Sequence, residues 1–234
     1  MESSFKFKRF EIENRKSALK VGTDAVLLGA AMTLRETDRF LLDIGTGTGV
    51  IALMAAQRLE SSRLSIEAID IDADSAEEAS RNFAASPWAG SLRAENTALF
   101  DYTPDRRFDC IFSNPPYYDN SLRNPDEREA VARHTESLSF TDICAFASEH
   151  LTGEGRLSLI LPAESEKALM RTAASFGLFP FRLLRVRTTP AKPFKRLVAE
   201  FSRSRGTVAE EVLVLMDAGT RSRDYSKLTE SFYL

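Results

Sequence analysis

A glycine-rich turn between an apolar segment and a helical pattern restricts the fold of this chain more than any other feature. Gly45-Thr46-Gly47-Thr48-Gly49 follows residues 40–44, which predict a buried strand, and precedes residues 50–59, whose apolar side chains recur at helical spacing. Glycines at such a turn let a ligand approach the backbone, and the helix N-terminus offers unpaired N–H groups. The pattern therefore predicts a ligand-binding edge of a parallel sheet.

The remaining sequence alternates strand-like and helix-like segments. We expect further strands at 64–70, 91–94, 108–113 and 157–161 and helices at 74–85 and 141–151, and we expect Gly153 and Gly155 to end the second helix. Such alternation predicts a mostly parallel central sheet with helices on both faces. Three strand-like runs follow without an intervening helix, at 181–188, 197–202 and 212–216, and the first two are expected to pair antiparallel. The predicted fold class is α/β and Rossmann-like, with an antiparallel edge.

Two acidic residues indicate the class of ligand. Asp70 ends the second predicted strand about 20 residues after the glycines, where a doubly wound sheet binds a ribose. Val50 stands where a dinucleotide fingerprint has Gly or Ala, and Asp43 would repel a pyrophosphate. A carboxylate before the glycines suits a ligand that carries an ammonium group. The sequence thus argues against an NAD-dependent oxidoreductase.

The segment from Leu42 to Gly49 resembles motif I of class I S-adenosylmethionine-dependent methyltransferases. The resemblance implies S-adenosyl-L-methionine as the cofactor and assigns the ribose hydroxyls to Asp70. It implies that Asn96, after the third strand, flanks the adenine. The residues that it places at the methionine part are Asp43, Gly45, Gly47 and Gly49.

A second motif, Asn114-Pro115-Pro116-Tyr117, follows the strand predicted at 108–113 and is expected beside the cofactor. An amine on a planar carbon is a poor nucleophile because its lone pair is delocalised. The Asn114 amide oxygen and the Pro115 carbonyl can each accept one N–H of such an amine. The two prolines fix the backbone, and Tyr117 offers a ring on which a base can stack. We expect direct in-line methyl transfer without a metal or a covalent intermediate.

This tetrapeptide resembles that of methyltransferases acting on adenine N6, guanine N2 or glutamine amides. Together with Lys20-Val21-Gly22-Thr23-Asp24 and the ending Phe232-Tyr233-Leu234, it resembles the bacterial tRNA1(Val) adenine-N6-methyltransferase family. Members of that family modify adenine 37, next to the anticodon. The alternatives are a methyltransferase for an rRNA guanine N2 or a protein glutamine amide, and a catalytically idle RNA-binding module.

The family resemblance also implies how the chain is organised. One methyltransferase domain is expected over 1–234, with residues 1–35 as a segment that caps substrate and cofactor and 36–234 as the catalytic core. It implies that Thr23 lies at the cofactor and that Tyr118 and Arg133 contact the RNA.

The formal net charge of −3 is the sum of two basic segments and an acidic remainder of the chain. Residues 182–205 contain eight Lys and Arg against one Glu, and residues 5–20 contain six against two. A Pro-rich loop with Lys192, Lys195 and Arg196 suits contact with a phosphate backbone, so the anticodon stem-loop of tRNA is the expected partner.

Composition restricts the remaining classes of protein. No apolar run approaches the roughly 20 residues of a membrane helix. Only Cys110 and Cys144 are present, each in an apolar segment, which indicates buried thiols in a reducing compartment rather than disulfides or a zinc site. We expect a cytoplasmic monomer without a metal and without a membrane partner.

Overall fold

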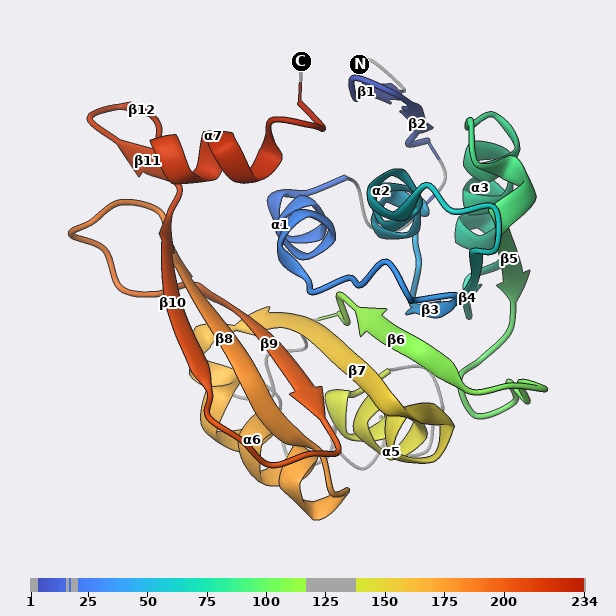
Figure 1. Ribbon diagram of the computed structural model, residues 1–234. Helices are drawn as coiled ribbons and strands as arrows, with labels where there is room; N and C mark the ends of the chain where they lie inside the picture. Colours follow the sequence, from blue (N-terminus) through green and yellow to red (C-terminus); the bar gives the residue numbers. More distant parts are fainter. Residues whose placement is uncertain (1–3, 16, 18–20, 117–137, 234) are drawn as a thin grey trace, which may run out of the picture.

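An eight-stranded, mostly parallel sheet forms the centre of the protein (Figure 1). The computed structural model describes residues 4–15, 17, 21–116 and 138–233. The strand order is β10-β8-β9-β7-β6-β3-β4-β5. The strands are β3 (Phe40–Ile44), β4 (Ser65–Asp70), β5 (Leu92–Asn96), β6 (Phe108–Ser113), β7 (Leu151–Pro162), β8 (Phe179–Arg187), β9 (Arg196–Ser202) and β10 (Ala209–Val214).

The direction of each strand decides which loops share an edge. Strands β7, β6, β3, β4 and β5 pair in parallel along the sheet. Strand β9 runs antiparallel to both β7 and β8, and β10 is parallel to β8. The expected α/β class and the antiparallel pairing of the first two late strands are therefore confirmed. Because β9 is antiparallel to both β7 and β8, strands β7 and β8 run in the same direction. The carboxyl end of β8 therefore lies at the same edge of the sheet as the carboxyl ends of β3, β4, β5, β6 and β7.

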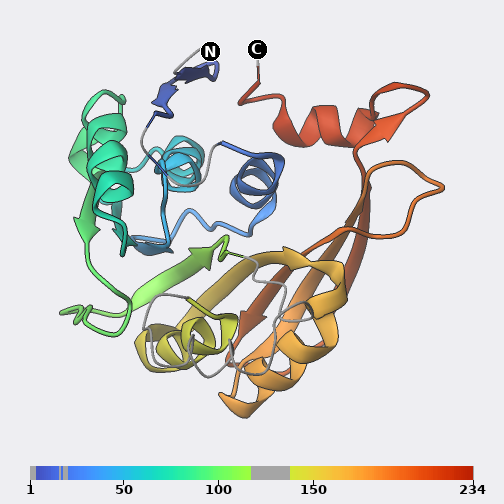
Figure 2. The ribbon, with the colours of Figure 1, turned by 180° about the vertical axis from the view of Figure 1, so that it is seen from behind.

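Helices cover both faces of the sheet (Figures 1 and 2). On one face lie α1 (Thr23–Ala31), α2 (Val50–Leu59) and α3 (Ala73–Ala84), and on the other α5 (Phe140–His150) and α6 (Glu166–Ser175). A hydrophobic core lies on each face of the sheet, and successive residues of a strand point into opposite cores. Leu41 and Phe112 belong to one core, and Leu42 and Ile111 belong to the other. Both cysteines are buried, as expected.

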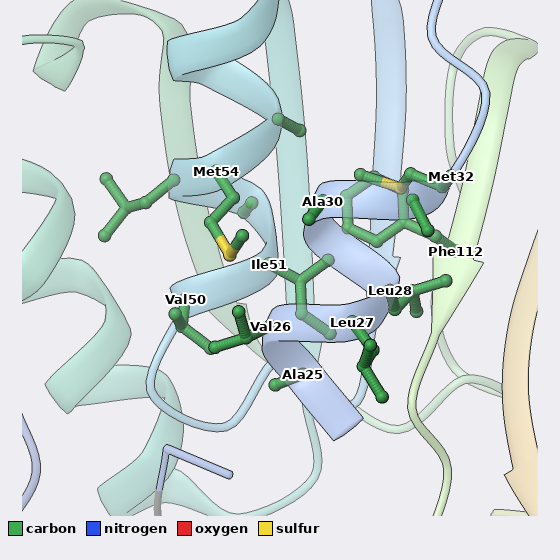
Figure 3. Packing of buried hydrophobic residues seen from close by; sticks show 14 of the residues in the cluster. Ala25, Val26, Leu27, Leu28, Ala30, Met32, Val50, Ile51, Met54 and Phe112 are labelled. Atoms are coloured by element: carbon green, nitrogen blue, oxygen red, sulfur yellow. The ribbon is translucent and has the colours of Figure 1, made fainter. Parts of the chain in front are cut away.

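Helix α1 is an integral part of the core. Its residues 25–31 are all buried, and a Cβ added at Gly29 would lie 2.7 Å from Met54 Sδ of α2. Figure 3 shows Ala25 and Val26 of α1 at the same level as Val50 of α2, so the N-terminal ends of the two helices lie on the same side. The part of residues 1–35 that the structure describes thus contributes to the hydrophobic core.

Buried charges fix the connection between α1 and β3 onto the sheet. Arg156 of β7, which is 1% exposed, forms an ion pair with Asp38. Glu200 of β9 is fully buried and accepts hydrogen bonds from the Thr33 backbone N–H at 2.7 Å and from Arg182 Nη1 at 2.8 Å. Buried charges are tolerated when they are paired in this way. The network fixes the loop before β3 to the sheet.

The two ends of the described chain pack together near the top of Figure 1. A hairpin of β1 (Ser4–Lys6) and β2 (Glu11–Glu13) meets the segment that follows α7 (Arg223–Thr229). The Lys8 backbone N–H donates to the Phe232 carbonyl at 2.8 Å, and the rings of Phe7 and Tyr233 stack with centroids 6.1 Å apart. A second hairpin is formed by β11 (Met216–Asp217) and β12 (Thr220–Arg221), and two 3-10 turns span Ala89–Ser91 and Ala163–Ser165.

The clearest difference from the sequence expectation lies after α5. We expected Gly153 and Gly155 to end the helix, but α5 ends at His150 and both glycines lie inside β7. A Cβ at Gly155 would stand 2.8 Å from the Phe108 carbonyl oxygen, beside a register shift between β6 and β7. Gly155 therefore allows a close backbone approach at an irregular strand pairing rather than a helix stop. Helix α6 has no counterpart among the helices expected from the sequence.

Replacement of Gly49 should destabilise the fold. Its φ is 81°, and a Cβ there would lie 2.4 Å from Cε1 of the buried Phe83. We expect Gly49→Ala to lower the free energy of unfolding by about 1–3 kcal/mol, through backbone strain and overpacking. Urea unfolding without ligand measures this. Gly153→Ala is the control because nothing lies within 4 Å of its added Cβ, and equal stability of the two variants would contradict this interpretation.

Candidate active site

Four strand ends meet at one edge of the sheet. Ile44 of β3 is paired with Ile69 of β4 and with Ser113 of β6, and Asp70 is paired with Asn96 of β5. The residues that follow these positions, including Gly45 and Asn114, must therefore emerge side by side. The fold thus brings the glycine loop, Asp70, Asn96 and the start of the Asn-Pro-Pro-Tyr motif to one place, as the sequence predicts.

The glycine loop has backbone angles that residues with a side chain rarely adopt. Gly45, Gly47 and Gly49 all have positive φ, of 69°, 56° and 81°. The N–H groups of Gly45 and Thr46 both donate to the Ile69 carbonyl, at 2.9 and 3.0 Å. The Gly47 N–H donates to Asp70 Oδ2 at 2.8 Å, which ties the loop to the end of β4. Glycine is the residue type that adopts these angles without strain.

Asp43 is a buried carboxylate, and only one of its two oxygens has a hydrogen-bond partner among the described residues. Its Oδ2 accepts a hydrogen bond from Thr46 Oγ1 at 2.8 Å, whereas Oδ1 has no hydrogen-bond partner among the described residues. Burial raises the pKa of this carboxyl to about 7; the charge of Asp70 adds to the rise, and the Thr46 hydroxyl opposes it. A buried acceptor without a donor is costly, so a ligand with an ammonium group would satisfy it.

Asp70 and Asn96 form the neighbouring part of the edge. Asp70 accepts N–H bonds from Gly47 and Asp72, and burial raises its pKa above the ordinary value. Asn96 Nδ2 donates to the carbonyls of Asp70 and Ile71, at 3.0 and 2.9 Å. Its Oδ1 is the group that it can offer to a ligand. Asn96 thereby also fixes the backbone that carries Asp70.

Ile71 is a residue that the sequence analysis missed. It follows Asp70 directly and is 53% exposed. An apolar surface next to the Asp70 carboxylate suits the face of a purine ring. The signal in the sequence was its position immediately after the acidic strand end.

Asn114 and Pro115 begin the loop after β6. Ser113 is buried and its Oγ donates to the Ile44 carbonyl at 2.6 Å, which ties the last residue of β6 to the last residue of β3. Asn114 is partly exposed, and Pro115 is buried. Pro116 closes the described part of this loop. The predicted site residues Tyr117, Tyr118 and Arg133 lie outside the described residues.

Thr23 lies at the N-terminal end of α1, on the side where α2 begins after Gly49. The next residue, Asp24, accepts a hydrogen bond from Arg196 Nε at 2.7 Å. This ion pair links the first turn of α1 to the start of β9. Arg196, expected to contact RNA, thus makes a contact within the protein.

Two polar residues on the buried face of α3 bind the N-terminal segment, and one of them, Asn82, also contacts the glycine loop. Asn82 Nδ2 donates to the Thr48 carbonyl at 2.8 Å, and its Oδ1 accepts from the Glu13 N–H at 2.8 Å. Glu78 accepts the backbone N–H of Arg15 at 2.8 Å. The sequence analysis missed these residues; their signal was two polar side chains among the apolar positions of an amphipathic helix.

The basic segment 182–205 is largely paired within the fold. Arg182 contacts Glu200 and Glu211 at 2.8 and 2.7 Å. Arg185 contacts Glu166 and Glu210 at 2.6 and 2.8 Å. Three of these four carboxylates lie outside the segment in sequence, which is why the local count of +7 overstates its charge. Of the basic groups that remain, Lys192 and Lys195 lie in the loop between β8 and β9, whereas Arg205 lies after β9, over the Phe179 ring.

Within the described residues, no cluster of three or more His, Cys, Asp or Glu could hold a metal ion. In the same part of the chain, no helix is both long and apolar enough to cross a bilayer.

Comparison with known proteins decides the family. Residues 16–172 match the model of the methyltransferase small domain. A tRNA1(Val) (adenine(37)-N6)-methyltransferase of Flavobacterium psychrophilum is 36% identical and covers 98% of this chain and 99% of its own. Proteins of the same name from Parabacteroides distasonis and Vibrio vulnificus are each 39% identical over 98% of this chain, and over 97% and 95% of theirs. The chain belongs to this methyltransferase family.

Solved structures agree with the family at the level of the fold. A predicted O-methyltransferase from Agrobacterium tumefaciens has a TM-score of 0.70 at 19% identity, covering 89% of this chain and 96% of its own. A methyltransferase from Pyrococcus furiosus has a TM-score of 0.60 at 21% identity, over 83% and 90% of the two chains. The family resemblance and the fold expected from the sequence are thereby confirmed.

The residues present fit the cofactor that the family implies. S-adenosyl-L-methionine carries an α-ammonium group, and the unpaired Oδ1 of Asp43 is a buried acceptor beside a loop without side chains. Ionisation of Asp43, unfavourable in the protein alone, becomes favourable beside a cation. If Asp43 holds the ammonium group, cofactor affinity is coupled to the protonation of this carboxyl.

Cofactor affinity should therefore depend on pH through Asp43. If the ionised carboxylate binds, a pKa of about 7 makes the wild-type affinity rise about fivefold between pH 6 and pH 7. Asp43→Asn should bind more weakly and without this rise, as measured by calorimetry in the same buffers. Equal pH dependence of both proteins would contradict the assignment.

The stability of the unliganded protein provides the control. A raised carboxyl pKa contributes stability that is present below about pH 4 and is lost as the pH rises through about 7. Without cofactor, Asp43→Asn should therefore melt at a higher temperature than the wild type at pH 8, and the difference should shrink at pH 5.

Proposed function

We propose that this protein transfers a methyl group from S-adenosyl-L-methionine to the N6 amine of adenine 37 in tRNA1(Val). The observation that carries the proposal is the pairing of Ile44 with Ser113, because it sets Asn114 and Pro115 beside the glycine loop. The names of the full-length relatives support tRNA adenine as the substrate, over an rRNA guanine or a protein glutamine amide.

In this proposal, the edge of the sheet binds the cofactor along its length. Asp43 Oδ1 accepts the ammonium group, and the backbone at Gly45, Gly47 and Gly49 lies against the methionine part. Asp70 accepts the ribose hydroxyls through lone pairs that its two backbone contacts leave available. The exposed side chain of Ile71 and Oδ1 of Asn96 contact the adenine. Thr23 closes the site from the start of α1.

The bound cofactor supplies an electrophilic methyl group on a sulfonium. The protein holds the acceptor amine in line with it: the Asn114 amide oxygen and the Pro115 carbonyl each accept one N–H. These contacts favour a pyramidal nitrogen whose lone pair points toward the methyl group. The carbon–sulfur bond would break as the carbon–nitrogen bond forms, and the methylated, cationic nitrogen would then release one proton to water. Pro116 fixes the loop, and Tyr117 stacks on the flipped-out base.

The RNA lies across the carboxyl edge of the sheet in this proposal. Lys192 and Lys195 contact the phosphates of the anticodon stem-loop, together with Tyr118 and Arg133. Arg196 acts through its ion pair with Asp24, which holds α1 at the site. The protein works as a cytoplasmic monomer of one domain, with residues 1–35 as its capping segment, and needs no metal ion.

Incubation with total tRNA and labelled S-adenosyl-L-methionine tests the function. We expect N6-methyladenosine as the labelled nucleoside, found in tRNA1(Val) at position 37. A tRNA1(Val) transcript with adenine 37 replaced by guanine is the matched control and should remain unlabelled. Label in another nucleoside or in protein would refute the proposed substrate.

Asn114→Ala should separate chemistry from cofactor binding. Removal of one preorganised hydrogen-bond acceptor from the reacting amine should lower kcat by about 10²–10³, while the Kd of the cofactor stays near that of the wild type. Single-turnover kinetics and calorimetry measure the two quantities. Asp70→Ala is the opposite control, because it should weaken cofactor binding. An unchanged kcat in Asn114→Ala would exclude the proposed role of the amide.

A further inference from the structure

We propose that Arg187 and Phe194 form a stacking platform for an unpaired base of the RNA substrate. The platform lies on the loop 188–195 that joins β8 and β9. The inference rests on the proposed function, since it assumes that RNA is the substrate, and it assigns two residues that the sequence analysis did not single out.

The topology places this loop at the active-site edge. Strand β8 is antiparallel to β9, which is antiparallel to β7, so β8 ends at the same edge as β7 and β6. Arg187 is the last residue of β8, as Ser113 is the last residue of β6. Figure 1 shows the loop as an orange projection beyond the ends of β8 and β9. An RNA whose target base reaches Asn114 therefore has this loop on the same side of the sheet.

Backbone hydrogen bonds connect the loop to the end of β8 and to the segment that follows β10. The Lys195 N–H donates to the Val186 carbonyl at 2.8 Å, and the Lys192 N–H to the Thr189 carbonyl at 3.1 Å. On the other side, the Leu215 N–H donates to the Arg187 carbonyl at 3.0 Å. Pro190 and Pro193 restrict the backbone further. A preordered loop loses little conformational entropy when it binds.

Arg187 differs from the other two arginines of β8. Arg182 and Arg185 each contact two carboxylates. The Arg187 guanidinium instead lies over the Phe194 ring, 5.5 Å from its centroid, and its buried Nε has no hydrogen-bond partner within the described part of the chain. Its positive charge is therefore not neutralised there by a carboxylate.

Phe194 is an exposed aromatic ring among cations. It is 38% exposed, stands between Lys192 and Lys195 in the loop, and is backed by Arg187. Proteins bind single-stranded RNA with this combination, because rings stack on unpaired bases while cations contact the phosphates. An acidic peptide would match the charge but would leave the ring without a stacking partner. The surface therefore fits a base of the anticodon loop.

Binding of an anticodon stem-loop RNA, measured by fluorescence anisotropy over a range of salt concentrations, tests the platform. Phe194→Leu should weaken binding about tenfold, within the range known for base stacking, and should leave the salt dependence unchanged. Phe194→Tyr keeps a ring and should bind like the wild type. Lys192→Gln with Lys195→Gln should instead reduce the slope of log K against log salt by about 0.7–0.9 for each phosphate that the variant no longer neutralises.

Further variants separate stacking from other roles. Arg187→Gln should weaken RNA binding, whereas Arg93→Gln, on the opposite edge strand β5, removes one exposed charge and should have no effect. Binding of poly-glutamate, which has no bases, should be the same for Phe194→Leu and the wild type. The proposed platform is wrong if Phe194→Tyr binds RNA as weakly as Phe194→Leu. It is also wrong if Phe194→Leu binds RNA more weakly only because this variant is less stable, as shown by a lower melting temperature.

The outcome for the platform can be told apart from that for the proposed function. A wild-type protein that methylates tRNA while Phe194→Leu binds RNA with unchanged affinity would overturn the platform alone. A wild-type protein that neither binds nor methylates tRNA would refute the proposed function, and the platform with it.

Discussion

Parallel pairing of β3 with β4 on one side and with β6 on the other is the constraint on which the site depends. It aligns Ile44 with Ile69 and Ser113, so that the glycine loop, Asp70 and Asn114 emerge at one edge although up to about 70 residues separate them in sequence. The hydrogen bond from Ser113 Oγ to the Ile44 carbonyl fixes this alignment at its last residue. Since loops at the carboxyl ends of parallel strands share one crevice, a cofactor and an acceptor can meet there.

Buried polar groups serve two different purposes in this fold. Glu200, Arg156 and Asn82 have partners, and they connect segments that lie far apart in the sequence. Asp43 has an oxygen without a partner among the described residues, and its burial raises its pKa to about 7. An unsatisfied buried carboxylate reduces the stability of the protein alone but provides strong selectivity for a cationic ligand. The two classes are distinguished by whether the protein itself completes the hydrogen bonds.

The basic segment 182–205 shows that the fold decides which basic side chains are paired with carboxylates. In the sequence, Arg182, Arg185 and Arg187 are equivalent members of one cluster. In the sheet, β10 and α6 bring Glu210, Glu211 and Glu166 to the first two, and Arg187 lies over Phe194 instead. Ion pairs between strands depend on register, and no register can be read from a charge count. The cations of the β8–β9 loop are thus the part of the cluster best suited to an RNA partner.

The sequence by itself determined the fold class, the helix and strand at the glycine loop and the family, because these depend on local patterns: glycine spacing, apolar periodicity and short motifs. It also placed Asp43, Asp70 and Asn114 at one edge of the sheet, because their positions follow from strand ends. The tertiary structure decided the features that depend on contacts between residues far apart in the sequence. Gly153 and Gly155 fall within a strand, Asn82 and Glu78 hold the N-terminal segment, and Arg196 binds Asp24. These outcomes depend on which groups packing brings together, and such pairs are far apart in the chain.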